Sequence, residues 1–272
     1  MKTPVEYRGV WALVTGASSG IGEEFARKLA ERGANLILAA RSAERLARLG
    51  EDLARVNRVE VRPIPVDLAE SRGRAELLGT IERAGVFVEH VVNNAGFGST
   101  GPFASLDPSR EAAMVRLNCE AVVALTRGLI EAMVRAGRGG IINVASVAGF
   151  QAVPYMATYG ATKAFVVSFT LALAPELHGT GVRAMALCPG PVRTSFQEAA
   201  GISRPGIPLA ELTARQTVER GLAAYERGES LYVPGFVNGL QVAASKLVPR
   251  GLLGWATVRA MRRMGRTGKN PG

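Results

Sequence analysis

Residues 10–22 read Val-Trp-Ala-Leu-Val-Thr-Gly-Ala-Ser-Ser-Gly-Ile-Gly, an apolar run followed directly by a glycine-rich turn. The run at residues 10–15 is typical of a buried strand, and the pattern after the turn predicts a helix over residues 23–32. Glycine lets a backbone turn sharply and approach a ligand with no Cβ in the way. The free N–H groups at the start of a helix favour a pyrophosphate. The spacing is Gly-x-x-x-Gly-x-Gly and not the Gly-x-Gly-x-x-Gly fingerprint. The prediction of a dinucleotide site therefore rests on the position of this turn between a strand and a helix.

The same alternation of strand and helix continues along the chain. Further buried strands are predicted over residues 35–40, 59–66, 88–92, 141–145, 182–187 and 230–233. Helices are predicted over residues 43–56, 70–84, 107–136, 155–178 and 213–227. Alternating strands and helices indicate an α/β fold: a single Rossmann-type, doubly wound parallel sheet of about seven strands with helices on both faces.

The chain has 272 residues, enough for one large domain. We expect a dinucleotide-binding and catalytic domain over residues 1–235 and a basic C-terminal extension over residues 236–272. The longest nearly apolar stretch, residues 164–175, is interrupted by Ser168 and Thr170 and is shorter than a membrane span.

The formal net charge of +10 is concentrated in the extension. Its seven cationic residues, with no Asp or Glu among them, are Lys246, Arg250, Arg259, Arg262, Arg263, Arg266 and Lys269. A helical pattern over residues 252–264 fits either a peripheral contact with an anionic membrane or a helix that covers the pocket or a partner subunit; we favour the second. Binding to nucleic acid is not expected, because no aromatic residues interleave the basic ones.

Cysteine and histidine are sparse. Cys119 and Cys188 each lie inside an apolar segment, which favours a reducing, cytoplasmic setting over a disulfide framework. His90 and His178 are far apart and have no Cys or His nearby, so we expect no metal site.

Residues 146–163 carry the chemistry: Ser-Val-Ala-Gly-Phe-Gln-Ala-Val-Pro-Tyr-Met-Ala-Thr-Tyr-Gly-Ala-Thr-Lys. Tyr159 and Lys163 are four residues apart and share one face of the predicted helix. An ammonium close to a phenol lowers the phenol pKa, so Lys163 is expected to make Tyr159 a better proton donor near neutral pH. Ser146, at a strand end, could hydrogen-bond the oxygen that Tyr159 protonates. The set suits carbonyl reduction or alcohol oxidation, although taken alone it also fits a surface pair and a helix cap.

The strand predicted at residues 35–40 is followed by Arg41 and Ser42, with no carboxylate. An acidic residue here would bind the adenosine ribose, whereas an arginine accommodates a 2′-phosphate, so NADP is favoured over NAD. Alternatively, Arg41 only opens the next helix with Ser42 as its N-cap. Asp67 either caps the helix at residues 70–84 or accepts a hydrogen bond from the adenine amine.

Asn118 lies in the middle of the helix predicted at residues 107–136. Asparagine is a mediocre helix residue, so a buried Asn118 needs a reason. It could satisfy a kinked backbone or hold a water in a proton relay. The pair Asn93-Asn94 at a strand end could serve only to lock the turn.

Taken in order, these motifs resemble the short-chain dehydrogenase/reductase family over about residues 8–235. The resemblance implies catalytic roles for Asn118, Ser146, Tyr159 and Lys163, with Tyr159 as the general acid. It implies cofactor contacts from Gly16, Ser18, Ser19, Gly20, Ile21, Gly22, Arg41, Ser42, Asp67, Leu68, Asn93, Ala95, Gly96, Tyr159, Lys163, Pro189, Gly190, Val192 and Thr194. By the same analogy, the helices at residues 107–136 and 155–178 form a dimer face, on which a tetramer can build.

Phe97, Gln151, Tyr155, Phe196 and the weakly patterned segment up to residue 212 are expected to line an apolar substrate pocket. The predicted function is an NADP-dependent oxidoreductase acting on an apolar ketone or aldehyde, or on a secondary alcohol, in the reductive direction. The alternative from another class is a non-catalytic NADP-binding regulator or scaffold.

Overall fold

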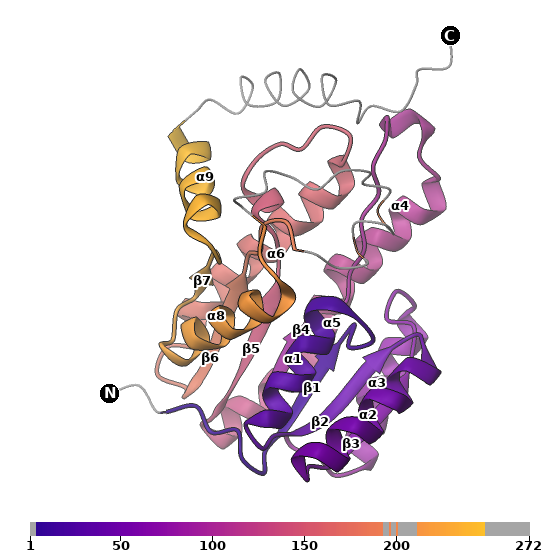
Figure 1. Cartoon of the computed structure of the whole chain (residues 1–272), viewed down its shortest axis with the longest axis vertical. Helices are drawn as coiled ribbons and strands as arrows, with labels where there is room; N and C mark the ends of the chain where they lie inside the picture. Colours follow the sequence, from indigo (N-terminus) through magenta and orange to yellow (C-terminus); the bar gives the residue numbers. More distant parts are fainter. Residues whose placement is uncertain (1–3, 193–195, 197–199, 201–210, 248–272) are drawn as a thin grey trace.

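A computed structural model describes residues 4–192, 196, 200 and 211–247. Seven parallel strands form one sheet in the order β3-β2-β1-β4-β5-β6-β7 (Figure 1). Their bounds are β1 Trp11–Thr15, β2 Asn35–Ala40, β3 Val61–Pro65, β4 Val88–Asn93, β5 Gly139–Val144, β6 Val182–Leu187 and β7 Leu231–Tyr232. The predicted doubly wound α/β fold is confirmed.

Helices cover both faces of the sheet (Figure 1). The longer ones are α1 Gly20–Glu31, α2 Ala43–Asn57, α3 Ser71–Arg83, α4 Pro108–Val115, α5 Ala121–Ala136, α6 Ala157–Glu176, α8 Ala214–Glu226 and α9 Phe236–Leu247, and the short ones are η1 Phe103–Ser105, η2 Arg116–Glu120 and η3 Val147–Phe150. One core cluster joins the sheet to α1, α2 and α8, and a second joins the opposite face to α3 and α5.

β2 shows why the strands read as unbroken apolar runs. Leu36 and Leu38 belong to the first core cluster, whereas Ile37 and Ala39 belong to the second. Successive side chains of a strand point to opposite faces, so a sheet covered on both sides needs apolar residues at every position. Full burial of each large aliphatic side chain stabilises the fold by about 1.5–3 kcal/mol.

The helix predicted over residues 107–136 is interrupted. It begins as expected, with the Asp107 side chain accepting a hydrogen bond from the Ser109 N–H at 2.9 Å and Pro108 in the first turn. It then widens into the π-helical turn η2 before continuing as α5. Asn118 lies in η2 and is fully buried, so the backbone does depart from a regular α-helix around this residue, as one of the two interpretations anticipated.

Two other helix starts differ from the prediction. α1 begins at Gly20 and not at residue 23, which brings the glycine turn directly to the helix start. α6 begins at Ala157 and not at residue 155, because Tyr155 adopts a left-handed φ of 65° that a helix cannot contain. The Tyr155 carbonyl instead accepts a hydrogen bond from the Gly101 N–H at 2.9 Å.

Of the described helices, only α6 is long and apolar enough to cross a membrane, a test that a core helix of a folded domain also passes. α6 packs against β6, with Val166 and Thr170 buried. Thr194, most of the segment predicted at residues 195–212, and the helix predicted at residues 252–264 lie outside the described residues.

Candidate active site

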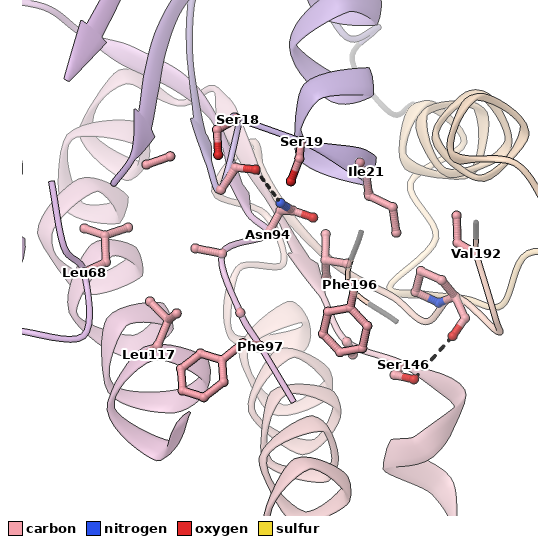
Figure 2. A pocket seen from close by; sticks show the side chains of 18 of the residues that line it. Ser18, Ser19, Ile21, Leu68, Asn94, Phe97, Leu117, Ser146, Val192 and Phe196 are labelled. Carbon is pink, nitrogen blue, oxygen red and sulfur yellow. Dashed lines mark hydrogen bonds between the residues drawn. The ribbon is translucent and has the colours of Figure 1, made fainter. Parts of the chain in front are cut away.

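A cavity of about 680 Å³ opens at the carboxyl ends of the strands (Figure 2). Ligands of open α/β sheets bind at this edge. The predicted site residues that line the cavity are Gly16, Ser18, Ser19, Gly20, Ile21, Arg41, Ser42, Asp67, Leu68, Ala95, Gly96, Phe97, Ser146, Tyr159, Lys163, Pro189, Gly190, Val192 and Phe196. Gly22, Asn93, Asn118, Gln151 and Tyr155 are not among the lining residues. The structure therefore brings most of the predicted constellation to one cavity.

The glycine turn is held against the end of β4. Gly16 has a φ of 65°, and a Cβ on it would lie 2.8 Å from the Nδ2 atom of Asn94. Asn94 Nδ2 donates to the Thr15 carbonyl at 2.9 Å, and the Thr15 hydroxyl accepts from the Asn94 and Ala95 N–H groups at 2.9 and 3.0 Å. A side chain at position 16 would separate the turn from β4.

Behind the turn, Gly22 serves packing. A Cβ there would lie 2.3 Å from the Gly16 carbonyl oxygen, so only glycine allows α1 to approach the turn this closely. In front, Ser18, Ser19, Gly20 and Ile21 face the cavity, and the N-cap Ser19 makes no side-chain hydrogen bond to the start of α1. The start of α1 therefore lines the cavity, and free N–H groups at a helix start favour a pyrophosphate.

Asn93 and Asn94 take different roles. Asn93 is buried and donates through Nδ2 to Asn143 Oδ1 at 2.8 Å and to Thr126 Oγ1 at 3.2 Å. It thus ties β4 to β5 and α5, and the expected cofactor contact from Asn93 stays a prediction. Asn94 lines the cavity in its place. The reason is the alternation of side chains along β4, whose last residue is Asn93.

Two arginines, Arg41 and Arg45, line the cavity. Arg41, Ser42 and Arg45 line it where β2 ends and α2 begins. Ser42 occupies the N-cap position of α2, but its side chain makes no capping hydrogen bond within that helix. Arg41 and Arg45 form no ion pair with any residue that the structure describes, whereas Arg48 pairs with Glu44 at 3.0 Å.

Asp67 also reaches the cavity, and its Oδ1 accepts a hydrogen bond from the Ala69 N–H at 2.9 Å. The N-cap of α3 is Glu70, so Asp67 closes the turn before the helix and does not cap it. The predicted role of Asp67 as the cap of this helix is therefore wrong. The carboxylate keeps acceptor capacity for a ligand, since a single N–H uses only part of it.

The remaining polar groups lie on η3 and α6. Ser146 Oγ accepts from the Ala148 N–H at 3.1 Å and donates to the Pro189 carbonyl at 3.4 Å (Figure 2). Tyr159 is buried, and its ring lies 5.5 Å from the Phe196 ring, centroid to centroid. Lys163 Nζ donates to the Val144 carbonyl at 2.8 Å and lies 5.8 Å from the centroid of the Tyr159 ring.

Burial has the largest effect on the pKa values of Tyr159 and Lys163. It raises the pKa of Tyr159 to about 12, a rise that the Ser146 hydroxyl opposes. Burial also lowers the pKa of Lys163 to about 8. The pKa of Tyr159 is therefore raised and not lowered as expected, because burial removes the hydration of the phenolate. Tyr159 therefore carries its proton at neutral pH.

Asn118 supports the cavity from behind. Its Oδ1 accepts from the Phe97 N–H at 3.2 Å, and its Nδ2 donates to the Phe97 carbonyl and to Thr162 Oγ1, each at 3.0 Å. Thr162 Oγ1 in turn donates to the Tyr159 carbonyl at 2.8 Å. The side chain thus connects the loop after β4 to α6 and fixes Phe97 at the cavity.

A family model described as short chain dehydrogenase matches residues 10–204. This chain belongs to the short-chain dehydrogenase family. As such it is an NAD(P)(H) oxidoreductase of CH–OH or C=O groups. Among the described residues of this short-chain dehydrogenase, no group of three or more His, Cys, Asp or Glu could hold a metal ion.

Individual relatives span several substrates. The chain is 36% identical over 186 residues to a sulfoacetaldehyde reductase 2 of Chromohalobacter salexigens, which covers 68% of this chain and 73% of the relative. It is 30% identical over 255 residues to a very-long-chain 3-oxoacyl-CoA reductase-B of Danio rerio, covering 92% and 75%.

Solved structures give the same fold with either cofactor. A short-chain dehydrogenase from Sphingobium yanoikuyae in complex with NADPH has a TM-score of 0.78 and 30% identity, covering 88% of this chain and 94% of that one. A 3-ketoacyl-(acyl-carrier-protein) reductase from Brucella melitensis complexed with NADH has a TM-score of 0.74 and 27% identity, covering 85% and 97%.

Sequence reasoning missed several residues that line the cavity of this short-chain dehydrogenase: Asn94, Arg45, Leu117, Val147 and Met156. Arg45 had a signal, since it lies in the first turn of a helix that begins at a strand end. Met156 replaces Tyr155 as a wall residue because the left-handed φ of Tyr155 precedes α6. Phe97 and Phe196 line the cavity as expected, whereas Gln151 does not.

Proposed function

We propose that this protein reduces an apolar ketone or aldehyde with NADPH. The observation that carries the proposal is that Ser146 and Tyr159 share one cavity with Phe97, Leu117 and Met156. Hydroxyl donors facing an apolar wall suit a substrate with one carbonyl and a hydrophobic body.

The nicotinamide, when bound, supplies the hydride that the carbonyl carbon receives. Tyr159 gives its phenolic proton to the carbonyl oxygen, and Ser146 donates a hydrogen bond to that oxygen. Charge then grows on an oxygen that two donors already face, which lowers the barrier. By resemblance to the family, Lys163 holds the nicotinamide ribose, and in its charged form it stabilises negative charge on Tyr159 after the proton leaves.

We also propose that NADP is preferred over NAD. Arg41 and Arg45 line the cavity without an ion pair among the described residues, so both guanidinium groups are available to a 2′-phosphate. The Sphingobium yanoikuyae structure with NADPH supports the preference, and the Brucella melitensis structure with NADH shows that the fold does not impose it.

The cofactor test compares Kd values for NADPH and NADH by fluorescence titration. Arg41→Ala and Arg45→Ala should each weaken NADPH binding by about tenfold, because a charge-assisted hydrogen bond is worth about 1.5–3 kcal/mol, and leave NADH binding unchanged. Arg55→Ala is the matched control, since Arg55 lies on the same helix as Arg45, pairs with Asp52 at 2.9 Å and does not line the cavity. An unchanged ratio of NADPH to NADH affinity in both variants would refute the preference.

The activity test measures NADPH consumption over a panel of apolar ketones and aldehydes. Tyr159→Phe keeps the ring against Phe196 and should lower kcat by about 10²–10⁴-fold, the usual contribution of a general acid. If NADPH binds but no panel member is reduced and no alcohol is oxidised, the regulator or scaffold alternative replaces the reductase.

We further propose a homodimer formed by the helices around the π turn and by α6. Large apolar side chains are exposed on these elements, at Val115, Val123, Val134, Phe165 and Leu171. Sedimentation velocity tests the proposal.

Two buried free cysteines, Cys119 and Cys188, agree with the proposed cytoplasmic setting.

A further inference from the structure

The turn between β3 and α3 lies at the end of the active-site cavity opposite Ser146. Its residues Asp67 and Leu68 line the cavity. In the sheet, β3 and β5, the strand that leads to Ser146, lie on opposite sides of β1, which leads to the glycine turn. A dinucleotide with its pyrophosphate at the glycine turn and its nicotinamide near Ser146 therefore places its adenosine here. We call residues 67–69 the adenosine turn.

Arg74, at the start of α3, holds the adenosine turn from outside the cavity. Its Nη1 atom donates to the Leu68 carbonyl at 2.9 Å and to the Ala69 carbonyl at 3.0 Å. The Arg74 side chain is 11% exposed, so little water competes for these bonds. Hydrogen bonds from a charged donor are about twice as strong as neutral ones. Arg74 does not line the cavity, so any effect on a ligand is exerted through the turn.

The other end of the Arg74 guanidinium reaches η2. Its Nη2 atom pairs with Glu120 Oε2 at 3.0 Å. The Glu120 side chain is 53% exposed, and an exposed ion pair contributes little stability by itself. η2 also contains Leu117, which lines the cavity on the same side as Leu68 (Figure 2). One guanidinium therefore connects two parts of the cavity wall that lie far apart in the chain.

Arg74 acts from a helix with a fixed position. A Cβ on Gly73 would lie 2.1 Å from the Asp67 carbonyl oxygen, so the first turn of α3 lies directly against the adenosine turn. A Cβ on Gly128 of α5 would lie 2.7 Å from Leu78 Cδ1 of α3, so these two helices are also closely packed. The hydrogen bond inside the adenosine turn only shapes it, whereas Arg74 ties the turn to α3 and η2.

We propose that Arg74 is a positioning residue for the adenosine half of the dinucleotide. It sets the place of the adenosine turn relative to η2, and so the place of Asp67 and Leu68 at the cavity wall. Its contribution falls on the adenosine, which NAD and NADP share, and not on the 2′-phosphate or the reacting carbonyl. The proposal rests on dinucleotide binding alone and does not depend on which cofactor is preferred or on turnover.

The experiment measures the Kd of AMP, the adenosine half common to both dinucleotides, by isothermal titration calorimetry on the full chain. Arg74→Met keeps a long apolar side chain and removes the hydrogen bonds to the turn and to Glu120. We expect the Kd of AMP to rise about tenfold, the equivalent of about one hydrogen bond lost to the ligand. The Kd values of NADPH and NADH should rise by the same factor. Their ratio is then unchanged, in contrast to the result expected for Arg41→Ala and Arg45→Ala.

Two further variants accompany Arg74→Met. Arg83→Met is the matched control, because Arg83 is exposed in the last turn of the same helix, donates to Thr80 Oγ1 at 3.0 Å and does not line the cavity. AMP binding should be unchanged in this variant. Arg74→Lys is a milder change that keeps a charged donor for the turn but loses the second nitrogen that reaches Glu120. Its Kd for AMP should rise about threefold.

A general loosening of the fold predicts a different pattern, in which kcat falls together with affinity. With saturating NADPH, Arg74→Met should change kcat by less than about twofold, because the groups that face the carbonyl lie at the other end of the cavity.

Several outcomes would overturn the proposal. An unchanged Kd of AMP in both Arg74 variants refutes it. So does a rise that Arg83→Met matches, or a fall in kcat as large as the loss of AMP affinity. If the AMP titrations agree with the proposal but no carbonyl is reduced, the reductase is refuted and the positioning role of Arg74 stands.

Discussion

Replacing Asn118 with leucine tests whether this residue acts as a structural support of the cavity. Asn118→Leu is similar in volume but removes the hydrogen bonds to the Phe97 N–H, the Phe97 carbonyl and Thr162 Oγ1. The two backbone groups of Phe97 lose their only side-chain partner in the described structure. Phe97 is half-buried, so we take the lower part of the usual cost of about 1–3 kcal/mol for each unsatisfied group, and expect a loss of about 2–4 kcal/mol for the two.

Urea unfolding followed by circular dichroism measures the loss as a change in the free energy of unfolding. Asn57→Ala is the matched control, because Asn57 makes one hydrogen bond, to the Leu53 carbonyl at 3.1 Å, at the end of α2. It should cost less than about 1 kcal/mol. The KM for NADPH and for the carbonyl substrate should rise in Asn118→Leu, since Phe97 loses its anchor. A loss no greater than that of Asn57→Ala would refute the support role.

Three further predictions concern pH and packing. Burial lowers the pKa of His90 below its usual 6.5. The neutral, buried ring therefore contributes its full share of the unfolding free energy above about pH 6.5, and this share is lost as the pH falls toward the pKa of the folded state. The unfolding free energy of His90→Gln, measured from about pH 8 to 5, should depend less on pH than that of wild type. The pKa of Lys163 is about 8, so kcat/KM for reduction should decline above that pH as the ammonium is lost, and a profile flat to about pH 9.5 would contradict this role. Gly22→Ala places a methyl group 2.3 Å from the Gly16 carbonyl oxygen and should lower the free energy of unfolding by at least about 2 kcal/mol. Gly239→Ala is the control, because no atom lies within 4 Å of the new Cβ. Its melting temperature should equal or exceed that of wild type.

The sequence predicted the elements best where burial on both faces imposed a simple pattern. β2 and β6 have the predicted bounds, because the apolar runs at residues 36–40 and 184–187 end at a polar turn and at a proline-containing turn, respectively. The interruption at Arg116–Glu120 was not predicted as a π turn, because a single inserted residue leaves the apolar period of the flanking helices almost unchanged.

Site residues lie elsewhere than expected where orientation, and not residue type, decides their position. Asn93 and Asn94 are chemically identical, and only the pairing of Asn93 with Asn143 across β4 and β5 shows which one faces inward. Tyr155 was expected at the pocket wall, and its left-handed backbone conformation was not evident from the sequence. The pKa of Tyr159 depends on how much water the folded chain excludes, a property of the whole domain.

The strand order has a consequence for how the chain acquires its shape during synthesis. β1, β2 and β3 form one contiguous half of the sheet and leave the ribosome first, so this half can pair before the rest is made. β4 then adds to the other edge of β1, and β5 to β7 follow outward in sequence order. Each strand from β4 onward therefore pairs with a strand that was made before it, whereas the outer edge of β3 receives no later strand. The wall that carries Ser146 and Tyr159 is completed late, only after β6 has paired with β5.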